Sequence, residues 1–451
     1  MKLQDYNRTL IKRLFILAAP MALQNVISFS VGLADNLMVG SLGEVALSGV
    51  YVANQLQNLL GMLVIGLSSA MLVLANQYWG NKDAVKVRSM VGMTLSFGLL
   101  VTGLLFTATL VFPQSILRLF TNDLSVIPES MRYFSVIRFS YLFFCITQVL
   151  IASMRCVEHV KIGMYLSMFT FSTNIFLNWV LIFGHLGMPA LGVQGAAIGT
   201  LIVRITECII MVVFVRFIDK RLFYRFKTIF SYDLALVKRY FKYGFPVILG
   251  DIFWGINLSI QGAIIGHLGA MVTAAASISM IIFQMVGVVI YGTAGATAII
   301  IGQTVGSGNI DLVKKYSRSL QVIFLIVGVI SGIVFFFVRE PVLMLYNLTP
   351  ESKDLAFRMM GVLSVIIVGT SYQMSSLTGI VRAGGATHFV LVNDLIHIWL
   401  FVIPSSLLAA FVFHADPVIV FALLKSDQIL KCIVAVIKVN RFKWIKNLTH
   451  G

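Results

Sequence analysis

The chain has little charge for its length and little that would hold a metal. Of 451 residues, 12% are charged and only 18 are Asp or Glu, whereas 59% are hydrophobic, and the mean hydropathy is +0.93. No soluble domain of this size could bury so much apolar surface in one core. The four cysteines are scattered without a CxxC pair or another metal-binding spacing, so we interpret them as apolar packing residues.

Long apolar runs fill the chain from end to end. Each run holds about 20 residues, which is enough for a helix to cross the hydrocarbon core of a bilayer. The pattern predicts an all-α, multi-pass membrane protein with twelve transmembrane helices. The twelfth is the weakest, because Lys425, Asp427 and Lys431 interrupt it. The spans are centred near residues 27, 62, 100, 145, 174, 205, 255, 287, 328, 369, 400 and 427.

Positive charges alternate between the loops. Because Lys and Arg favour the cytoplasmic side in short loops, both termini are expected in the cytoplasm. The start, MKLQDYNRTLIKRLF, is polar and basic and shows no small-residue cleavage site, so we expect a protein of the cell (inner) membrane without a cleaved signal. The formal charge of +16 lacks the interleaved aromatic residues of a nucleic-acid surface, and no nucleic-acid partner is expected.

Two halves of the chain resemble each other. The segment from Pro20 aligns without gaps with the segment from Pro246, and NQYWGNKD aligns with GQTVGSGNID. Each half holds six spans, so the repeat is parallel, which is typical of transporters that work by alternating access. A scaffold enlarged by duplication is the other interpretation. The matched residues are Pro20 with Pro246, Gly40 with Gly266, Gly43 with Gly269, Gln77 with Gln303, Gly80 with Gly306 and, after two inserted residues, Asn81 with Asn309 and Asp83 with Asp311.

The repeat predicts three regions. Residues 1–215 form an N-lobe with spans 1–6, residues 216–242 form a linker, and residues 243–451 form a C-lobe with spans 7–12. The linker, RFIDKRLFYRFKTIFSYDLALVKRYFKY, is basic, aromatic and amphipathic. It is expected to lie as a cytoplasmic helix on anionic membrane lipid, although a calmodulin-like partner site would have a similar composition.

Several segments together resemble the multidrug and toxic compound extrusion (MATE) transporters. They are DNLMVGSLG, NQYWGNKD, NIFLNWVLIFGHLGMPALGVQGAAIGT, RAGGATHF and RFKWIKNLT, and the resemblance covers essentially the whole chain. It implies twelve helices in two pseudo-symmetric six-helix lobes arranged as a V. It also implies export of cationic or amphipathic organic compounds in exchange for Na⁺ or H⁺, with no other cofactor and no enzymatic activity.

Asp35, in the first span, matches the acid that serves MATE proteins as a coupling-cation site. A carboxylate in a low-dielectric cleft favours its protonated form, whereas a bound cation favours its charged form, so such a group can exchange the two. The resemblance assigns the N-lobe cation site to Asp35, Asn174, Asn178 and Thr200. Na⁺ is the metal considered, at Asp35, Asn174 and Asn178.

Asn178 departs from the family pattern, because many members carry an aspartate there. An amide oxygen can bind a cation but cannot release a proton. One carboxylate with amide and hydroxyl oxygens could still hold a hard cation such as Na⁺, and a proton would need only Asp35. Alternatively, Asn174 and Asn178, one helical turn apart, make only a hydrogen bond between helices.

In the second half, Asp251 is the candidate for a carboxylate that faces substrate or cation. Trp254 and Asn257 follow on broadly the same side of the helix, and an indole beside a carboxylate suits an organic cation. Gln261 takes the repeat position of Asp35, and Gln284 completes the candidate set. The other interpretation places Asp251 near the membrane interface, where water hydrates it.

Other ionisable residues inside the spans have structural explanations. Arg204 and Glu207 are three residues apart and can pair on one helix face. Asp394 and His397 have the same spacing, and a lone membrane histidine is more often a structural donor. Arg204 is expected to be essentially the only buried positive charge.

The sequence therefore predicts a secondary multidrug antiporter that is a monomer, with small organic cations or amphipathic drugs as substrates. A flippase for lipid-linked saccharide precursors is the alternative, and it would need a large, strongly cationic cavity. An intramembrane enzyme or receptor has no support, because the chain contains no GxSxG or HExxH motif.

Overall fold

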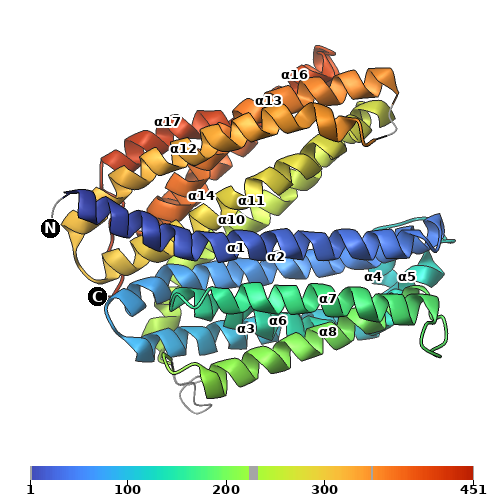
Figure 1. Ribbon diagram of the computed structural model, residues 1–451, viewed down its shortest axis with the longest axis horizontal. Coiled ribbons are helices and arrows are strands. Elements are labelled where there is room, and N and C mark those ends of the chain that lie inside the picture. Colours follow the sequence, from blue (N-terminus) through green and yellow to red (C-terminus); the bar gives the residue numbers. More distant parts are fainter. Residues whose placement is uncertain (1–2, 223–231, 347–348, 450–451) are drawn as a thin grey trace. The chain divides into compact units, whose positions relative to one another are not determined.

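The structure is a computed structural model that describes residues 3–222, 232–346 and 349–449. Every regular element in these ranges is a helix (Figure 1). The prediction of an all-α protein is confirmed.

In its described residues, the first half contains eight α-helices and one short π-helical segment, η1. Their bounds are α1 Leu3–Gly40, α2 Glu44–Gly80, α3 Ala84–Val111, α4 Pro113–Arg118, α5 Ile127–Ile137, α6 Ser140–Cys156, α7 Lys161–Phe183, α8 Val193–Val213 and η1 Phe214–Ile218.

The helices of the second half are more often interrupted, and three π-helical segments, η2 to η4, occur in the part of it that the structure describes. The bounds are α10 Leu234–His267, α11 Ala270–Gly306, α12 Ile310–Leu343, α13 Pro350–Met374, η2 Ser375–Arg382, α14 Thr387–Leu395, η3 Ile396–Val402, α15 Ile403–Leu407, η4 Leu408–Val412, α16 Pro417–Leu424 and α17 Asp427–Asn440.

Ten helical stretches in the described residues are long and apolar enough to cross a membrane. Helices α5 and α6 make an eleventh span if they are taken together, with a bend of 54° between them. The twelfth predicted span corresponds to α16 and α17, which are separated at Lys425 and Ser426. Of the charged residues that weakened this span in the sequence, Lys425 lies in the break, Asp427 begins α17 and Lys431 lies within it.

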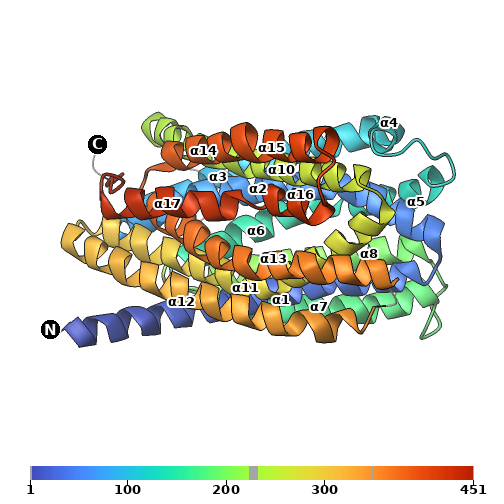
Figure 2. The ribbon, with the colours of Figure 1, turned by 90° about the horizontal axis from the view of Figure 1, so that it is seen from above.

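The chain divides into two compact units. The N-terminal unit consists of Leu23–Ala75 and Asp83–Phe241, and the C-terminal unit consists of Met1–Ala22, Asn76–Lys82 and Lys242–Gly451. In the N-terminal unit, α8 packs against α5, α6 and α7. In the C-terminal unit, α13 packs against α11, α12 and α17, as Figure 2 shows from above.

The beginning of α1 and the end of α2 thus belong to the unit that the second half builds. Glycines make this packing close. A Cβ on Gly292 would lie 2.8 Å from the Ala18 carbonyl oxygen, and a Cβ on Gly302 would lie 2.7 Å from the Asn76 Cβ. The division into lobes at residues 215 and 243 remains a prediction. Within the predicted linker, residues 223–231 lie outside the described residues, and α10 already begins at Leu234.

The sequence repeat has a direct counterpart at the ends of α2 and α11. A Cβ on Gly80 would collide with the backbone of Gln303, and a Cβ on Gly306 would collide with the backbone of Gln77. These are two repeat-related pairs that contact each other reciprocally within the C-terminal unit. Only glycine permits such an approach of two backbones.

The turns repeat as well. Gly43 and Gly269, which follow α1 and α10, have φ angles of 114° and 110°, in the region that favours glycine. Asp83 caps α3 by accepting the Lys86 N–H, and Asn309 caps α12 by accepting the Leu312 N–H. The cap position therefore pairs Asp83 with Asn309, and the two inserted residues in the sequence alignment were wrong. Because Asp and Asn cap a helix equally well, matching identical residue types placed the two segments in the wrong register.

Candidate cation and substrate sites

Asp35 lies on α1 within the N-terminal unit, and its side chain is half-buried. Asn178 of α7 donates a hydrogen bond from Nδ2 to Asp35 Oδ1 at 2.5 Å, and the same Nδ2 lies 3.2 Å from Asn174 Oδ1. Asn174 and Asn178 are fully buried. The structure thus brings together three of the four residues that the resemblance assigns to the cation site.

The Asn178 amide is oriented with its donor toward the carboxylate, and its oxygen has no hydrogen-bond partner although it is buried. The absence of a side chain on Gly199 of α8 leaves room for this oxygen, since a Cβ there would lie 2.8 Å from Asn178 Oδ1. A buried acceptor without a donor is costly. A rotated amide would point this oxygen toward Asp35 and complete a set of carboxylate and amide oxygens, the ligands that a hard cation prefers.

The site differs from a transition-metal centre. No group of three or more His, Cys, Asp or Glu side chains that could hold a metal ion occurs in the part of the chain that the structure describes. A single carboxylate with neutral oxygens is compatible with Na⁺ as a transported ion, and the carboxylate alone is sufficient for a proton.

Thr200 and Tyr133 form a second polar contact in the same unit. The Tyr133 hydroxyl interacts with the side chains of Asn54 and Thr200, and the charge of Asp35 also acts on the tyrosine. Thr200 therefore reaches the site through Tyr133. Sequence reasoning missed Tyr133, because the ring comes from α5, outside the motifs that resemble the family, and nothing in SMRYF marks it as a site residue.

Arg204 and Glu207 pair within α8. Arg204 Nη1 lies 2.9 Å from Glu207 Oε2, and the Thr170 hydroxyl donates to Glu207 Oε1 at 2.5 Å. The guanidinium also lies over the Phe144 ring, 5.1 Å from its centroid. These contacts satisfy both charges locally, so the cluster holds α7 and α8 together.

In the C-terminal unit, the candidate residues separate. Asp251 Oδ1 lies 3.2 Å from Arg382 Nη1 of η2, so an internal cation already neutralises this carboxylate. Trp254 is 49% exposed, and Gln284 is exposed as well. Asn257 and Gln261 are buried and bonded to each other, with Gln261 Nε2 at 3.2 Å from Asn257 Oδ1.

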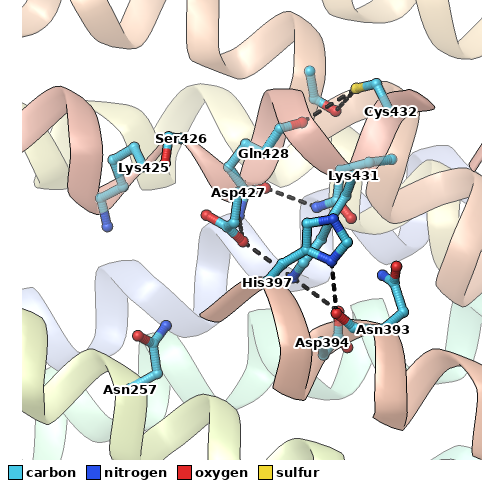
Figure 3. Close-up of polar contacts among 12 residues, drawn as sticks. Asn257, Asn393, Asp394, His397, Lys425, Ser426, Asp427, Gln428, Lys431 and Cys432 are labelled. Carbon is cyan, nitrogen blue, oxygen red and sulfur yellow. Dashed lines mark hydrogen bonds and ion pairs between the residues drawn. The ribbon is translucent and has the colours of Figure 1, made fainter. Parts of the chain in front are cut away.

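Gln261 also contacts a charge that the sequence interpretation left out. Lys425, in the break between α16 and α17, donates from Nζ to Gln261 Oε1 at 2.7 Å, and only 9% of the lysine is exposed. Figure 3 shows Lys425 at one end of a polar cluster that continues along α17.

The centre of that cluster is Lys431. Its Nζ lies 2.8 Å from Asp394 Oδ1 and 3.1 Å from Asp427 Oδ2, and Gln428 Nε2 donates to the second of these carboxylates at 2.7 Å (Figure 3). His397 Nδ1 lies 2.8 Å from the Asn393 carbonyl oxygen and serves a local structural contact.

The expectation that Arg204 is essentially the only buried positive charge is wrong. Lys425 and Lys431, with 9% and 4% exposure, are both at least as buried as Arg204, the partner of Glu207. Two carboxylates from different helices compensate Lys431. The sequence could not show this pairing, because Asp394 and Lys431 meet only in the folded chain.

A family model, MatE, matches residues 20–180 and again residues 246–408. The two matches begin at Pro20 and Pro246, where the internal repeat begins. The fold and the duplicated match define a membrane transporter. The chain belongs to the MatE family, that of the multidrug and toxic compound extrusion transporters.

Curated relatives carry names that fit this family. A protein of Thermotoga maritima named probable multidrug resistance protein NorM is 25% identical over 86% of this chain and 83% of its own length. A Bacillus subtilis protein named probable multidrug resistance protein YoeA is 27% identical over 84% and 82%. Among solved structures, a mutant of the Vibrio cholerae MATE transporter VcmN has a TM-score of 0.89 and 17% identity, with 99% of this chain and all of the other covered.

Proposed function

We propose that this protein is a secondary antiporter that exports cationic or amphipathic organic compounds in exchange for a cation bound at Asp35. One observation carries the proposal. Asp35 accepts a hydrogen bond from a buried amide of α7, Asn178, whose oxygen has no partner. A carboxylate held in this way keeps its charge available to a cation. The names of the relatives support multidrug efflux.

The contact also suggests how the ion changes the protein. In the structure, the donor side of the Asn178 amide faces the carboxylate. A Na⁺ ion at Asp35 would repel this N–H group and attract the amide oxygen, and a protonated Asp35 would donate to the same oxygen. Either ion therefore reverses the preferred amide orientation. Because Asn178 belongs to α7, the reversal couples ion binding at α1 to the packing of α7, and alternating access would follow from this preference.

The predicted topology gives the direction of transport. Lys and Arg favour the loops on the side of both termini, which places those loops in the cytoplasm if the protein lies in the inner membrane. An inward cation gradient would then drive export.

The test is ethidium efflux from proteoliposomes with Na⁺ and H⁺ gradients imposed separately. Efflux driven by one gradient, and reduced to the level of empty liposomes in Asp35→Asn, is expected. The matched control is Asp123→Asn, an exposed acid between α4 and α5 whose carboxylate accepts from nearby Ser125, and it should transport as the wild type does. Efflux that Asp35→Asn leaves unchanged would remove Asp35 from the mechanism.

A flippase for lipid-linked saccharides has less support. Such a protein needs a large, strongly cationic cavity for a pyrophosphate. Asp394 and Asp427 pair with Lys431, and Asp251 pairs with Arg382, so the positive charges of this region are largely compensated from within.

A further inference from the structure

Lys425 is a buried cation with incomplete compensation. It lies between α16 and α17 with 9% of its surface exposed, and its Nζ donates to the neutral side chain of Gln261. Among the described residues, no carboxylate oxygen lies within ion-pair distance of its Nζ. An ammonium group carries three donors, and a buried cation is unfavourable unless it is paired.

The nearby acids are already engaged. Asp427, two residues along the chain, binds Lys431 and accepts from Gln428. Asp394 binds Lys431 from the other side. The Gln261 amide uses its oxygen for Lys425 and its nitrogen for Asn257. The protein therefore supplies the Lys425 ammonium with one neutral hydrogen-bond acceptor, and Asp427, which pairs with Lys431, acts on it through its charge without forming an ion pair.

The repeat makes this arrangement informative. Gln261 occupies on α10 the position that Asp35 occupies on α1. In the N-terminal unit the position holds an acid that meets an amide, and in the C-terminal unit it holds an amide that meets a base. The position in the C-terminal unit thus lacks a negative charge, whereas the position in the N-terminal unit lacks a positive charge.

We propose that Lys425, together with Gln261, binds the carboxylate of an amphipathic organic substrate. This inference rests on the proposed transport function and assigns to the C-terminal unit a binding site for the carboxylate of an acid or a zwitterion. A single ammonium matches a single negative charge, whereas a pyrophosphate would require several cations. The carboxylate would supply the charge partner that Lys425 lacks and accept the free N–H donors.

The test measures binding of a rhodamine with a free carboxylate and of its methyl ester to the purified full-length protein in nanodiscs. The two dyes share the cationic ring system, and the ester replaces the negative charge of the carboxylate with a methyl group. In Lys425→Met, the affinity for the carboxylate dye should fall at least tenfold while the affinity for the ester stays within twofold. The control Lys443→Met removes an exposed lysine outside the helices and should change neither affinity. Equal losses for both dyes, or no loss for the carboxylate dye, would overturn the proposal.

A second variant keeps the lysine and fills its site. Gln261→Glu places a carboxylate beside Lys425. It should therefore raise the melting temperature and lower the affinity for the carboxylate dye as strongly as Lys425→Met does. Wild-type affinity in a folded Gln261→Glu protein would contradict the site.

A competition experiment distinguishes between the possible sources of negative charge. Displacement of the dye by acetate and not by chloride at equal ionic strength supports a carboxylate site, and displacement by chloride alone indicates an inorganic anion site instead.

Binding at equilibrium needs no ion gradient. Failure of ethidium efflux would therefore refute the antiporter proposal without changing these affinities, and a failed dye comparison would leave the efflux result intact.

Discussion

The two repeat-related positions, Asp35 on α1 and Gln261 on α10, contact opposite kinds of partner. Asp35 accepts from the amide of Asn178, and Gln261 accepts from the ammonium of Lys425. The backbone around them repeats, as the matched turns at Gly43 and Gly269 show. Duplication therefore preserved the helix positions and allowed the charges to diverge. The two halves therefore share an architecture and carry different charges at this repeat position.

The surroundings of the two positions differ in the same sense. In the N-terminal unit, the buried ion pair between Arg204 and Glu207 is formed within one helix. In the C-terminal unit, Lys431 of α17 joins Asp394 of α14 and Asp427 of its own helix. The second unit thus depends more strongly on charges that meet across helices, and its stability should be more sensitive to their loss.

The largest effect is expected from Lys431→Met. The substitution leaves two carboxylates without their cation, and Asp427 is nearly fully buried, so the free energy of unfolding should fall by about 3–5 kcal/mol. Thermal unfolding in detergent measures the loss. The control Arg132→Gln breaks an exposed pair with Glu129 and should cost less than about 1 kcal/mol.

A double variant checks the reason. Adding Asp427→Asn to Lys431→Met removes one of the two abandoned charges and should recover part of the stability. If the double variant recovers no stability, the loss in Lys431→Met comes from packing. The difference in charge pairing between the two units would then not explain that loss.

An intermediate effect is expected from Asn178→Asp, which adds a second acid 2.5 Å from Asp35 in the orientation that the amide now has. Two carboxylates at that distance cannot both stay charged without a cation between them. The melting temperature should therefore rise more steeply with added NaCl than that of the wild type, with choline chloride as the salt control. Combining the change with Asp35→Asn should restore the wild-type salt response, and a steep response in the double variant would place the ion elsewhere.

The smallest effect is expected from Gly199→Ala. The new methyl group would lie 2.8 Å from Asn178 Oδ1, so it must displace the amide, at a cost of about 1–3 kcal/mol as for other overpacked sites. Ethidium efflux should fall in parallel. Gly103→Ala, in the interior of α3 with no atom within 4 Å of its added Cβ, should instead gain about 0.5–1 kcal/mol. Efflux equal in the two variants would show that the Asn178 amide does not control Asp35.

Much of the fold could be predicted because apolar runs and glycine turns are local signals. The long runs gave the helices, and charges inside the last run marked the break at Lys425. The details of the repeat were less accessible: the shared cap position of Asp83 and Asn309 depends on helix geometry, and matching letters pointed to a different register.

The sequence by itself determined the class of protein, the helical spans, the internal repeat and the candidate acid Asp35. The first three follow from composition and spacing, since a bilayer admits few ways to satisfy the backbone, and the role predicted for Asp35 follows from the resemblance to the family. Only the tertiary structure decided the partners: Asn178 for Asp35, Arg382 for Asp251, and Lys425 for Gln261. Such pairs join residues more than 130 positions apart, and no local pattern in the sequence indicates which of these residues meet in the folded chain.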